Sequence, residues 1–390
     1  TVTSTGTTAV YSVNGVGFQP DFIWIKCRSA TPAHQLFDSV RGSSKRIGSD
    51  TTAAEITDST DRLLSFDSDG FTMGGDSNVN LAGRTYVAWC WDAGTGSAAS
   101  NSDGSIASTV KANQDYGFSI VSYTGTGSNA TVGHGLGAAP KLIIAKCRPA
   151  ADDWGVYEAS EGAGKFASLN STAAFSSVST VWQGVEPTSS VFSVGTSAIA
   201  NRSANTHIAY CFADVTGYQK IGSYTGNGST NGPTVTTGFK PAWIMVKRSS
   251  GGTSNWDILD TTRSTSNIIN KRIYANLSNA EPAASDFVEL LSDGFKLKNT
   301  ASSQNASGST YIYLAIADTR DALFTSDASG NSNNWDSNDL QHSDVMPDTP
   351  TDGFATVNVL SDVSNIALSE GNLKLTSTTD SWPTVRGTIG

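Results

Sequence analysis

The chain has 390 residues, with 25 Lys and Arg against 35 Asp and Glu, and its formal net charge is −10. The basic residues do not gather into a cluster, which argues against a nucleic-acid partner. The apolar runs are too short to cross a bilayer, so the sequence predicts no membrane insertion. A mildly acidic, hydroxyl-rich composition is typical of an extracellular or particle-associated protein.

The first predicted strand lies in a stretch that occurs three times along the chain. Residues 17–29 read GFQPDFIWIKCRS, residues 137–149 read GAAPKLIIAKCRP and residues 238–250 read GFKPAWIMVKRSS. In each stretch a proline ends a turn, a short apolar run follows and a Lys comes at its end. Continuous apolar runs of this length predict central strands that are covered on both faces.

Further positions match at constant spacing, which predicts an internal repeat. The stretches HQLFDSVRG, WGVYEASEG and WDILDTTRS come next, and the repeats close on TYVAWCW, THIAYCF and TYIYLAI. An acid recurs in the first set of stretches, and an Asn recurs shortly before the second set. The acids are Asp38, Glu158 and Asp260, and the amides are Asn80, Asn201 and Asn305.

These matches divide the chain into predicted segments. The sequence of repeat 1 begins partway through the segment that forms the first strand of the other two repeats, so we expect its natural N-terminus to lie upstream. A polar, Gly/Ser-rich segment after repeat 1 has the composition of a flexible linker. The predicted segments are repeat 1 at 1–93, the linker at 94–115, repeat 2 at 116–216, repeat 3 at 217–320, and a C-terminal module or extended tail at 321–390.

The predicted fold class is all-β. The recurrent runs are short and rich in Ile, Val, Tyr and Trp, and clusters of Gly, Asn, Asp and Ser separate them. Each repeat has about the size of one β-sandwich or jelly roll, near a hundred residues. The sequence therefore predicts three tandem, jelly-roll-like β-sandwich repeats and a partial C-terminal β module. It leaves open whether the repeats pack side by side or extend along an axis.

The four cysteines fall at two matching positions. Cys27 and Cys147 lie on the opening strands, and Cys90 and Cys211 lie on the closing strands. Repeat 3 lacks both, which predicts that the two positions touch. The pairs are then either buried thiols or one disulfide in each of the first two repeats, which requires Cα atoms within about 7 Å.

The recurrent acids and amides have a functional and a structural interpretation. A carboxylate near Trp154 or Trp256 has the chemistry to bind a sugar. The alternative is a turn carboxylate that accepts backbone N–H groups and pairs with a nearby Arg. Because the acid recurs in every repeat, we favour the structural role, and we expect the recurrent Asn side chains to bond local backbone in turns.

Motifs for catalysis are missing from the sequence. It contains no GxSxG elbow, no HExxH and no phosphate-binding loop, so we expect neither an enzyme nor a bound cofactor. The stretch DASGNSNNWDSND at 327–339 has the ligand types of a calcium loop but lacks the Gly and closing Glu of an EF-hand. We interpret it as a polar interdomain loop and predict no metal site.

The repeated block GFQPDFIWIKCRS…LFDSVRG…LLSFDSDGFTMG…TYVAWCW resembles a repeat of tail-fibre and related virion proteins of tailed bacteriophages, notably marine and cyanobacterial ones. The resemblance covers residues 1–320 and provides no catalytic residue. It implies a structural or adhesive virion component that forms a homotrimer and is located on the extracellular phage particle after synthesis in the host cytoplasm. Its implied partners are other virion proteins and a host surface glycan.

The end of the chain resembles a different kind of module. The stretches NNWDSNDL (333–340), DTPTDGFATVNVL (348–360), GNLKLT (371–376) and WPTVRGTIG (382–390) resemble the opening of SPRY-like, concanavalin-type sandwiches in such phage proteins. Residues 321–390 are therefore expected to begin a SPRY-like β module.

Three functions follow as alternatives. A tail fibre or receptor-binding appendage is expected to expose Trp154, Trp182 or Trp256 on loops over a shallow groove that binds glycan. A capsid decoration or tail-hub protein is expected to bury these aromatic side chains against neighbouring subunits. A glycan-cleaving tailspike enzyme needs two acids about 5–9.5 Å apart in a cleft.

Overall fold

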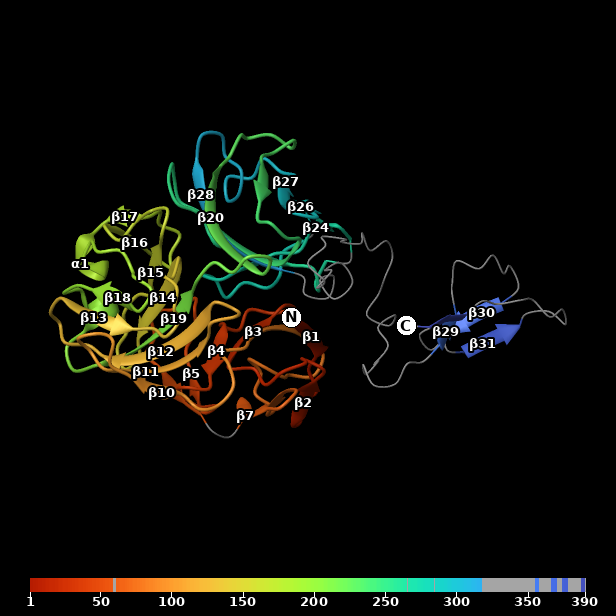
Figure 1. Cartoon of the computed structure of the whole chain (residues 1–390), viewed down its shortest axis with the longest axis horizontal. Coiled ribbons are helices and arrows are strands. Elements are labelled where there is room, and N and C mark those ends of the chain that lie inside the picture. Colours follow the sequence, from red (N-terminus) through yellow and green to blue (C-terminus); the bar gives the residue numbers. More distant parts are fainter. Residues whose placement is uncertain are drawn as a thin grey trace. The chain divides into compact units, whose positions relative to one another are not determined.

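The computed structural model describes residues 1–317, apart from residues 59, 60, 265 and 284, together with four short strands between residues 355 and 389. The chain divides into two units, Thr1–Asp318 and Thr319–Gly390. Figure 1 shows the first unit as three groups of strands, coloured red to orange, yellow to green, and green to blue along the sequence. The three groups correspond to repeats 1, 2 and 3.

Repeat 1 forms two principal antiparallel sheets. The first, which we call its inner sheet, has the order β1-β9-β3-β4, and the second, its outer sheet, has the order β2-β8-β7, with β5 and β6 pairing separately. The strands are β1 (Val2–Thr5), β2 (Tyr11–Asn14), β3 (Phe22–Cys27), β4 (Gln35–Asp38), β5 (Lys45–Arg46), β6 (Ile56–Thr57), β7 (Leu63–Asp67), β8 (Gly70–Met73) and β9 (Thr85–Trp91).

Repeat 2 has an inner sheet of order β10-β11-β12-β19-β14-β15-β16-β17 and an outer pair β13-β18. Two one-turn helices, α1 (Ser179–Trp182) and α2 (Ala198–Asn201), precede and follow β18 in sequence. The strands are β10 (Ala99–Asn101), β11 (Ser108–Asn113), β12 (Phe118–Thr124), β13 (Ala130–Gly133), β14 (Leu142–Cys147), β15 (Gly155–Glu158), β16 (Lys165–Ser168), β17 (Ser176–Ser177), β18 (Val191–Val194) and β19 (Thr206–Phe212).

The prediction of a flexible linker at 94–115 was wrong. This segment contains β10 and β11, and β11 pairs along its whole length with β12. It is also tied to repeat 1, because Lys111 Nζ donates to Asp21 Oδ1 at 2.6 Å in a buried ion pair. The Gly and Ser residues lowered the apparent strand propensity, whereas pairing with an existing sheet edge decided the conformation.

Repeat 3 follows the plan of repeat 1. Its inner sheet has the order β20-β28-β22-β23-β25, and its outer sheet has the order β21-β27-β26-β24. The strands are β20 (Gln219–Thr225), β21 (Thr234–Thr236), β22 (Pro241–Arg248), β23 (Trp256–Asp260), β24 (Ile268–Ile269), β25 (Ile273–Tyr274), β26 (Val288–Leu291), β27 (Gly294–Leu297) and β28 (Thr310–Ala317).

The three inner sheets share one strand order. In each sheet the closing strand lies between the first strand of the repeat and the recurrent apolar strand. The apolar strand pairs on its other side with the strand that ends in the recurrent acid. The prediction of an all-β sandwich architecture is confirmed. No helix in the described residues has the length and apolar character required to cross a membrane.

A single hydrophobic core joins the three repeats. Phe22 of repeat 1 stacks on Tyr210 of repeat 2, with ring centroids 4.2 Å apart, and Trp91 of repeat 1 meets Trp243 of repeat 3 edge-on at 5.6 Å. These side chains belong to one buried cluster that draws on all three inner sheets. The repeats therefore pack side by side around a common core and do not extend along an axis.

The shared core explains the continuous apolar runs. On β3, Phe22 and Trp24 lie in the shared core, whereas Ile23 and Ile25 lie in the core between the two sheets of repeat 1. Successive strand residues point to opposite faces, and both faces of this strand are buried. The predicted covering of these strands on both faces is confirmed, and the second cover is supplied by the neighbouring repeats.

In the second unit the structure describes two strand pairs. One joins β29 (Ala355–Val357) to β32 (Gly387–Ile389), and the other joins β30 (Ile366–Ser369) to β31 (Lys374–Ser377). The predicted SPRY-like module therefore stays a prediction, and the stretch 327–339 lies outside the described residues.

Candidate functional site

The recurrent residues gather at the three interfaces between repeats, which we call seam 1–2, seam 3–1 and seam 2–3. The direction of contact is the same at each seam: repeat 2 docks onto the acid strand of repeat 1, repeat 1 onto that of repeat 3, and repeat 3 onto that of repeat 2. The contacts described below establish this cyclic order. Because it closes after three repeats, every acid strand is covered by a neighbour.

The recurrent acid occupies one register position in every repeat. Asp38 lies opposite Phe22, Glu158 opposite Leu142, and Asp260 opposite Trp243, each on the neighbouring strand of the inner sheet. All three acids are buried. The backbone therefore presents the same carboxylate position to each seam, and the surrounding side chains determine its state.

At seam 1–2 the acid has both a cation and a neighbour's hydroxyl. The Arg41 guanidinium pairs with Asp38 through Nε, and neither side chain is exposed. From repeat 2, the Tyr210 hydroxyl donates to Asp38 Oδ2 at 2.8 Å. The carboxylate is thus neutralised inside repeat 1 and bonded across the seam.

Seam 3–1 repeats this arrangement with a different donor. Arg263 Nε pairs with Asp260 Oδ2 at 2.6 Å, again without exposure of either side chain. Trp89 of repeat 1 donates its indole N–H to the same oxygen at 3.0 Å. Burial raises the pKa of Asp260, but the charge and hydrogen bonds of Arg263 outweigh it and hold the pKa below its ordinary value.

A second carboxylate bridges each of these two seams. Glu55 accepts from Arg148 Nε at 2.9 Å across seam 1–2, and from Arg41 at 3.2 Å within its own repeat. Glu281 does the same at seam 3–1, where it accepts from Arg28 and Arg263. Charge-assisted, two-pronged Arg–carboxylate contacts are specific in geometry as well as favourable.

Seam 2–3 keeps the backbone contact but, among the residues that the structure describes, none of this ion pairing. The backbone N–H of Phe175 donates to Ser249 O at 3.2 Å, as Glu55 and Glu281 donate to Arg148 and Arg28 at the other seams. The side chains differ at four equivalent positions: Phe175 replaces the bridging Glu, Ser249 replaces the Arg that reaches it, Glu161 replaces the Arg beside the acid, and Leu314 replaces the aromatic donor.

Glu158 is consequently the one recurrent acid that pairs with no Lys or Arg among the described residues. It accepts from the hydroxyl and N–H of Ser160, at 2.6 and 2.9 Å, and from the N–H of Glu161 at 3.2 Å. Burial outweighs these bonds and raises the pKa of Glu158 to about 7. A carboxyl group that ionises near neutrality therefore lies at this seam.

The prediction that Trp154, Trp182 and Trp256 are exposed was wrong, since all three are at most 1% exposed. The Trp154 indole N–H donates to Gly48 O of repeat 1 at 2.9 Å, and that of Trp256 donates to Ser168 O of repeat 2 at 3.1 Å. Trp182 lies within repeat 2's own core. A large ring with one polar edge suits a buried interface as well as a sugar site.

Repeat 1 has His34 where the other repeats have the seam Trp. Its Nδ1 accepts from Trp24 Nε1 at 2.7 Å, so Nε2 carries the proton and donates to Tyr274 O of repeat 3 at 2.9 Å. Burial lowers the pKa of His34 to about 3, which keeps the ring neutral. Each seam thus has one ring N–H donor to the same backbone position of the next repeat.

The Lys at the end of each apolar run is also buried. Lys26 and Lys146 donate through Nζ to backbone carbonyl groups of their own repeats. Lys247 donates across seam 2–3 to Thr172 O at 2.9 Å and, within its own repeat, to Ser254 O at 2.5 Å. Burial lowers the pKa of Lys26 to about 8 and that of Lys247 to about 7.

The recurrent Asn side chains bond backbone groups in every repeat, one of them six residues earlier and the others far away in the chain. Asn201 accepts from Thr126 N at 2.7 Å and donates to Ser128 O and Gly195 O, both at 2.6 Å. Asn80 and Asn305 make equivalent sets of bonds. Each Asn therefore ties the turn before the closing strand to the loop after the first strand of its repeat, which for Asn201 lies 75 residues earlier in the chain.

The predicted contact between paired cysteines was wrong. Cys27 lies opposite Tyr86 and Cys90 opposite Ile23, so the two are four residues apart along neighbouring strands. Cys147 and Cys211 are separated in the same way. All four thiols are free, and burial raises the pKa of Cys211 to about 12. These cysteines pack as small apolar groups.

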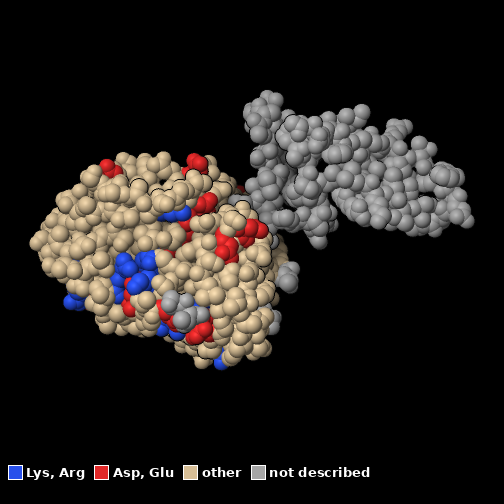
Figure 2. Space-filling view, turned by 90° about the horizontal axis from the view of Figure 1, so that it is seen from below, with Lys and Arg blue, Asp and Glu red and all other residues tan. Residues whose placement is uncertain are grey.

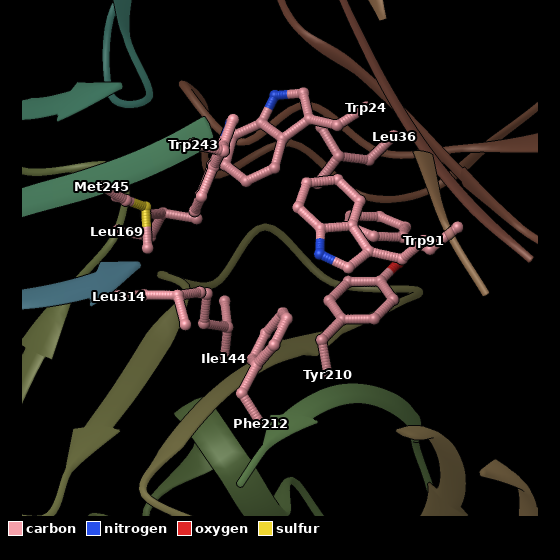
Figure 3. A pocket seen from close by; sticks show the side chains of 11 residues that line it. Trp24, Leu36, Trp91, Ile144, Leu169, Tyr210, Phe212, Trp243, Met245 and Leu314 are labelled. Carbon is pink, nitrogen blue, oxygen red and sulfur yellow. The ribbon is translucent and has the colours of Figure 1, made fainter. Parts of the chain in front are cut away.

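A small cavity lies in the shared core (Figure 3). Its volume is about 10 Å³, and it is lined by apolar and aromatic side chains from all three repeats, including Trp91, Trp243 and Leu314. This volume is about that of one water molecule, far below that of a ligand pocket. In the described part of the chain, the indole N–H groups of Trp91 and Trp243 have no hydrogen-bond partner.

The face of the described unit seen in Figure 2 carries few charges. Figure 2 shows Lys, Arg, Asp and Glu in small clusters of both signs, separated by broad neutral areas. Within residues 1–317, leaving out the four undescribed positions, no three His, Cys, Asp or Glu side chains lie close enough to hold a metal ion. The ion pairs of Arg41, Lys111 and Arg263 with their acids are by contrast buried.

Sequence reasoning missed Glu55, Glu281, Arg28 and Arg148 as seam residues.

No curated protein matches this sequence, and no solved structure matches this chain. The profile of one family, described as Domain of unknown function (DUF7483), matches residues 1–320. Since this match spans most of the 390 residues, the chain belongs to the DUF7483 family.

Proposed function

We propose that this chain is a structural or adhesive component of a bacteriophage virion, with residues 1–317 acting as a preassembled block in a tail fibre or related appendage. The observation that supports this function is the closed packing of the three repeats. Each inner sheet is covered by a neighbour, and the aromatic residues that a glycan site would need are bonded at the seams.

The buried aromatic residues favour a structural role over receptor binding at these positions. Trp154 and Trp256 donate to backbone carbonyl groups of the neighbouring repeat, so neither indole edge is available to a sugar. The recurrent acids are likewise occupied by bonds within and between repeats. We therefore propose no catalytic role and no cofactor, and we assign any host contact to the outer loops and outer sheets.

The packing of the repeats bears on which surfaces the expected homotrimer would use. Within one chain, the three repeats already make the heterologous, cyclic contacts that three subunits of a trimer would make. A homotrimer of this chain would then use surfaces other than the seams, in contact with other virion proteins.

Immunogold electron microscopy of purified phage particles, with antibodies raised against residues 1–317, tests this function. We expect label on the tail or its appendages, and masking of the label there by an excess of the soluble chain. Label on the capsid surface would favour a decoration protein, and absence of the chain from purified particles would overturn a virion role.

Adhesion and architecture are separated by a competition assay. If the block contacts the host, the purified chain reduces adsorption of the phage to its host cells. If it is purely architectural, adsorption is unchanged while particles lacking the chain are incomplete.

A further inference from the structure

Seam 2–3 places the carboxyl group of Glu158, which has no Lys or Arg partner among the described residues, beside the shared core. Glu158 lies on β15 on the same face as Trp154 and Val156, both of which belong to the shared core. Its three donors all come from the turn that follows it. Where Tyr210 or Trp89 reaches the acid at the other seams, repeat 3 has Leu314, a shared-core residue with no hydrogen-bonding group.

Other titratable groups lie near Glu158, but they do not neutralise it. Glu161 pairs with Lys165 at 2.9 Å, so that cation is already engaged by a different acid. The negative charge of Glu161 raises the pKa of Glu158 further. The groups on the elements around this position are Tyr157 on β15, Glu161 and Lys165 around β16, Tyr313 on β28 and, elsewhere in the seam, Lys247 on β22.

Ionisation of Glu158 is therefore unfavourable while the seam is closed. A charged carboxylate that leaves water needs a cation or a full set of donors in compensation. Asp38 and Asp260 have both an Arg and a donor from the adjacent repeat, whereas Glu158 has only its own turn. Opening of the seam would allow water to solvate the charge.

We propose that seam 2–3 is a pH-sensitive joint, closed while Glu158 is protonated and loosened when Glu158 ionises. The direction follows from linkage: a carboxyl group that binds its proton more tightly in the closed state stabilises that state at low pH. For Glu158 the ordinary pKa is 4.5 and the closed-state pKa about 7, so this stabilisation is complete below 4.5 and is lost as the pH rises to 7.

Lys247 acts at the same seam in a different pH range. Its pKa falls from 10.5 to about 7, so the closed seam becomes relatively more stable as the pH rises from 7 towards 10.5. Below pH 7 the lysine is protonated whether the seam is open or closed. The contribution of Glu158 is therefore separable from it on the acidic side of neutrality.

Hydrogen–deuterium exchange of the full chain tests the joint. Between about pH 5 and about pH 6.5, after correction for the intrinsic pH dependence of exchange, we expect opening of seam 2–3 to increase on the order of tenfold. Peptides that cover residues 165–177 and 249–257 report on this seam. Peptides that cover residues 45–57 report on seam 1–2 and are expected to stay unchanged.

Two variants remove the response in different ways. Glu158→Gln has no group to ionise, and Glu161→Arg restores the Arg that stands beside the acid at the other seams. Both are expected to hold seam 2–3 exchange at its low-pH level. Glu289→Gln, which alters a partly exposed pair with Lys298 in repeat 3, keeps the wild-type response and serves as the control.

Three results would overturn the proposal of a pH-sensitive joint. They are no pH-dependent increase in exchange at seam 2–3 in the wild type, an equal increase at all seams, or an increase that persists in Glu158→Gln. Should Glu158→Gln fail to fold, Glu161→Arg decides alone, since it adds a cation without removing the acid. Persistence of the response in a folded Glu161→Arg chain then refutes the joint.

Discussion

Seams 1–2 and 3–1 differ from seam 2–3 in chemistry, although the strands that form them have the same order and register. The first two combine a buried Asp–Arg pair, an aromatic donor from the adjacent repeat and a bridging Glu. The third has apolar or uncharged side chains at the bridging positions and an acid without a cation in the described structure. One backbone arrangement thus supports both a polar and an apolar interface.

The difference also favours one cyclic order of the repeats. In the observed order, Arg28 meets Glu281, Arg148 meets Glu55, and Ser249 lies beside Phe175. In the opposite order Arg28 would meet Phe175, and Glu55 would meet Ser249, so two partly buried charges would lose these partners. The apolar seam therefore acts against the wrong arrangement as well as supporting the right one.

The largest expected effect comes from removing an Arg beside a buried acid. Arg263→Met leaves Asp260 buried without its cation, and we expect the free energy of unfolding to fall by about 3–5 kcal/mol. Glu161→Met, at the equivalent position of seam 2–3, is expected to cost less than about 1 kcal/mol. Urea titration of both variants measures the contrast, and equal losses would contradict the distinction between the seams.

The next effect concerns a feature that all repeats share. Asn201 is itself fully buried, and Asn201→Ala removes its bonds to three backbone groups, so we expect a loss of about 2–4 kcal/mol in unfolding free energy. Asn80→Ala and Asn305→Ala are expected to lose similar amounts. Asn205→Ala, which removes one exposed bond to Ser203 O, is the matched control. If the losses in unfolding free energy instead differed between the repeats at the ion-paired seams and the repeat at seam 2–3, these Asn residues would belong to the interfaces.

A pH-dependent effect of intermediate size is expected from Lys247. Because its folded-state pKa of about 7 lies below the ordinary 10.5, the unfolded chain binds the extra proton between these values. Stability should then rise by about 1–2 kcal/mol from about pH 7 to about pH 9. Lys247→Met should remove that part of the rise in denaturant titrations, whereas Lys298→Met, on the partly exposed pair, should retain it.

The smallest effect is expected from rebuilding the missing bridge. Phe175→Glu together with Ser249→Arg copies the Glu–Arg contact of the other seams, and we expect the double variant to lie within about 1 kcal/mol of wild type. Each single variant should be less stable than the pair, with a favourable coupling of about 1 kcal/mol in a double-mutant cycle. Zero coupling would show that the side chains do not meet at seam 2–3.

Much of the fold can be read from local patterns. Short apolar runs, turn residues and constant spacing predict strands and a threefold repeat, because strand formation depends on alternation and turn chemistry within a few residues. The same patterns failed at 94–115, where β11 forms against β12. A polar strand of this kind depends on the sheet edge that it joins, and no local pattern encodes that edge.

The candidate site was harder to predict, because its partners lie far apart in sequence. A signal was present: Arg28 and Arg148 recur in two repeats with Ser249 in the third, and Glu55 and Glu281 recur with Phe175 in the third. The two exceptions, Phe175 and Ser249, lie in different repeats. That they belong to the same interface becomes clear only when repeat 3 is known to contact repeat 2. The aromatic residues were misread for the same reason, since a neighbouring repeat covers them.

The sequence by itself determined the all-β class, the three repeats and the recurrent acids and amides, because these follow from periodicity and composition. Only the tertiary structure decided that the repeats close around a shared core, that Trp154 and Trp256 face a neighbour, and that Glu158 lacks a cation among the described residues. Burial and charge compensation are properties of surfaces brought together by folding, and residues about a hundred positions apart acquire them only in the packed chain.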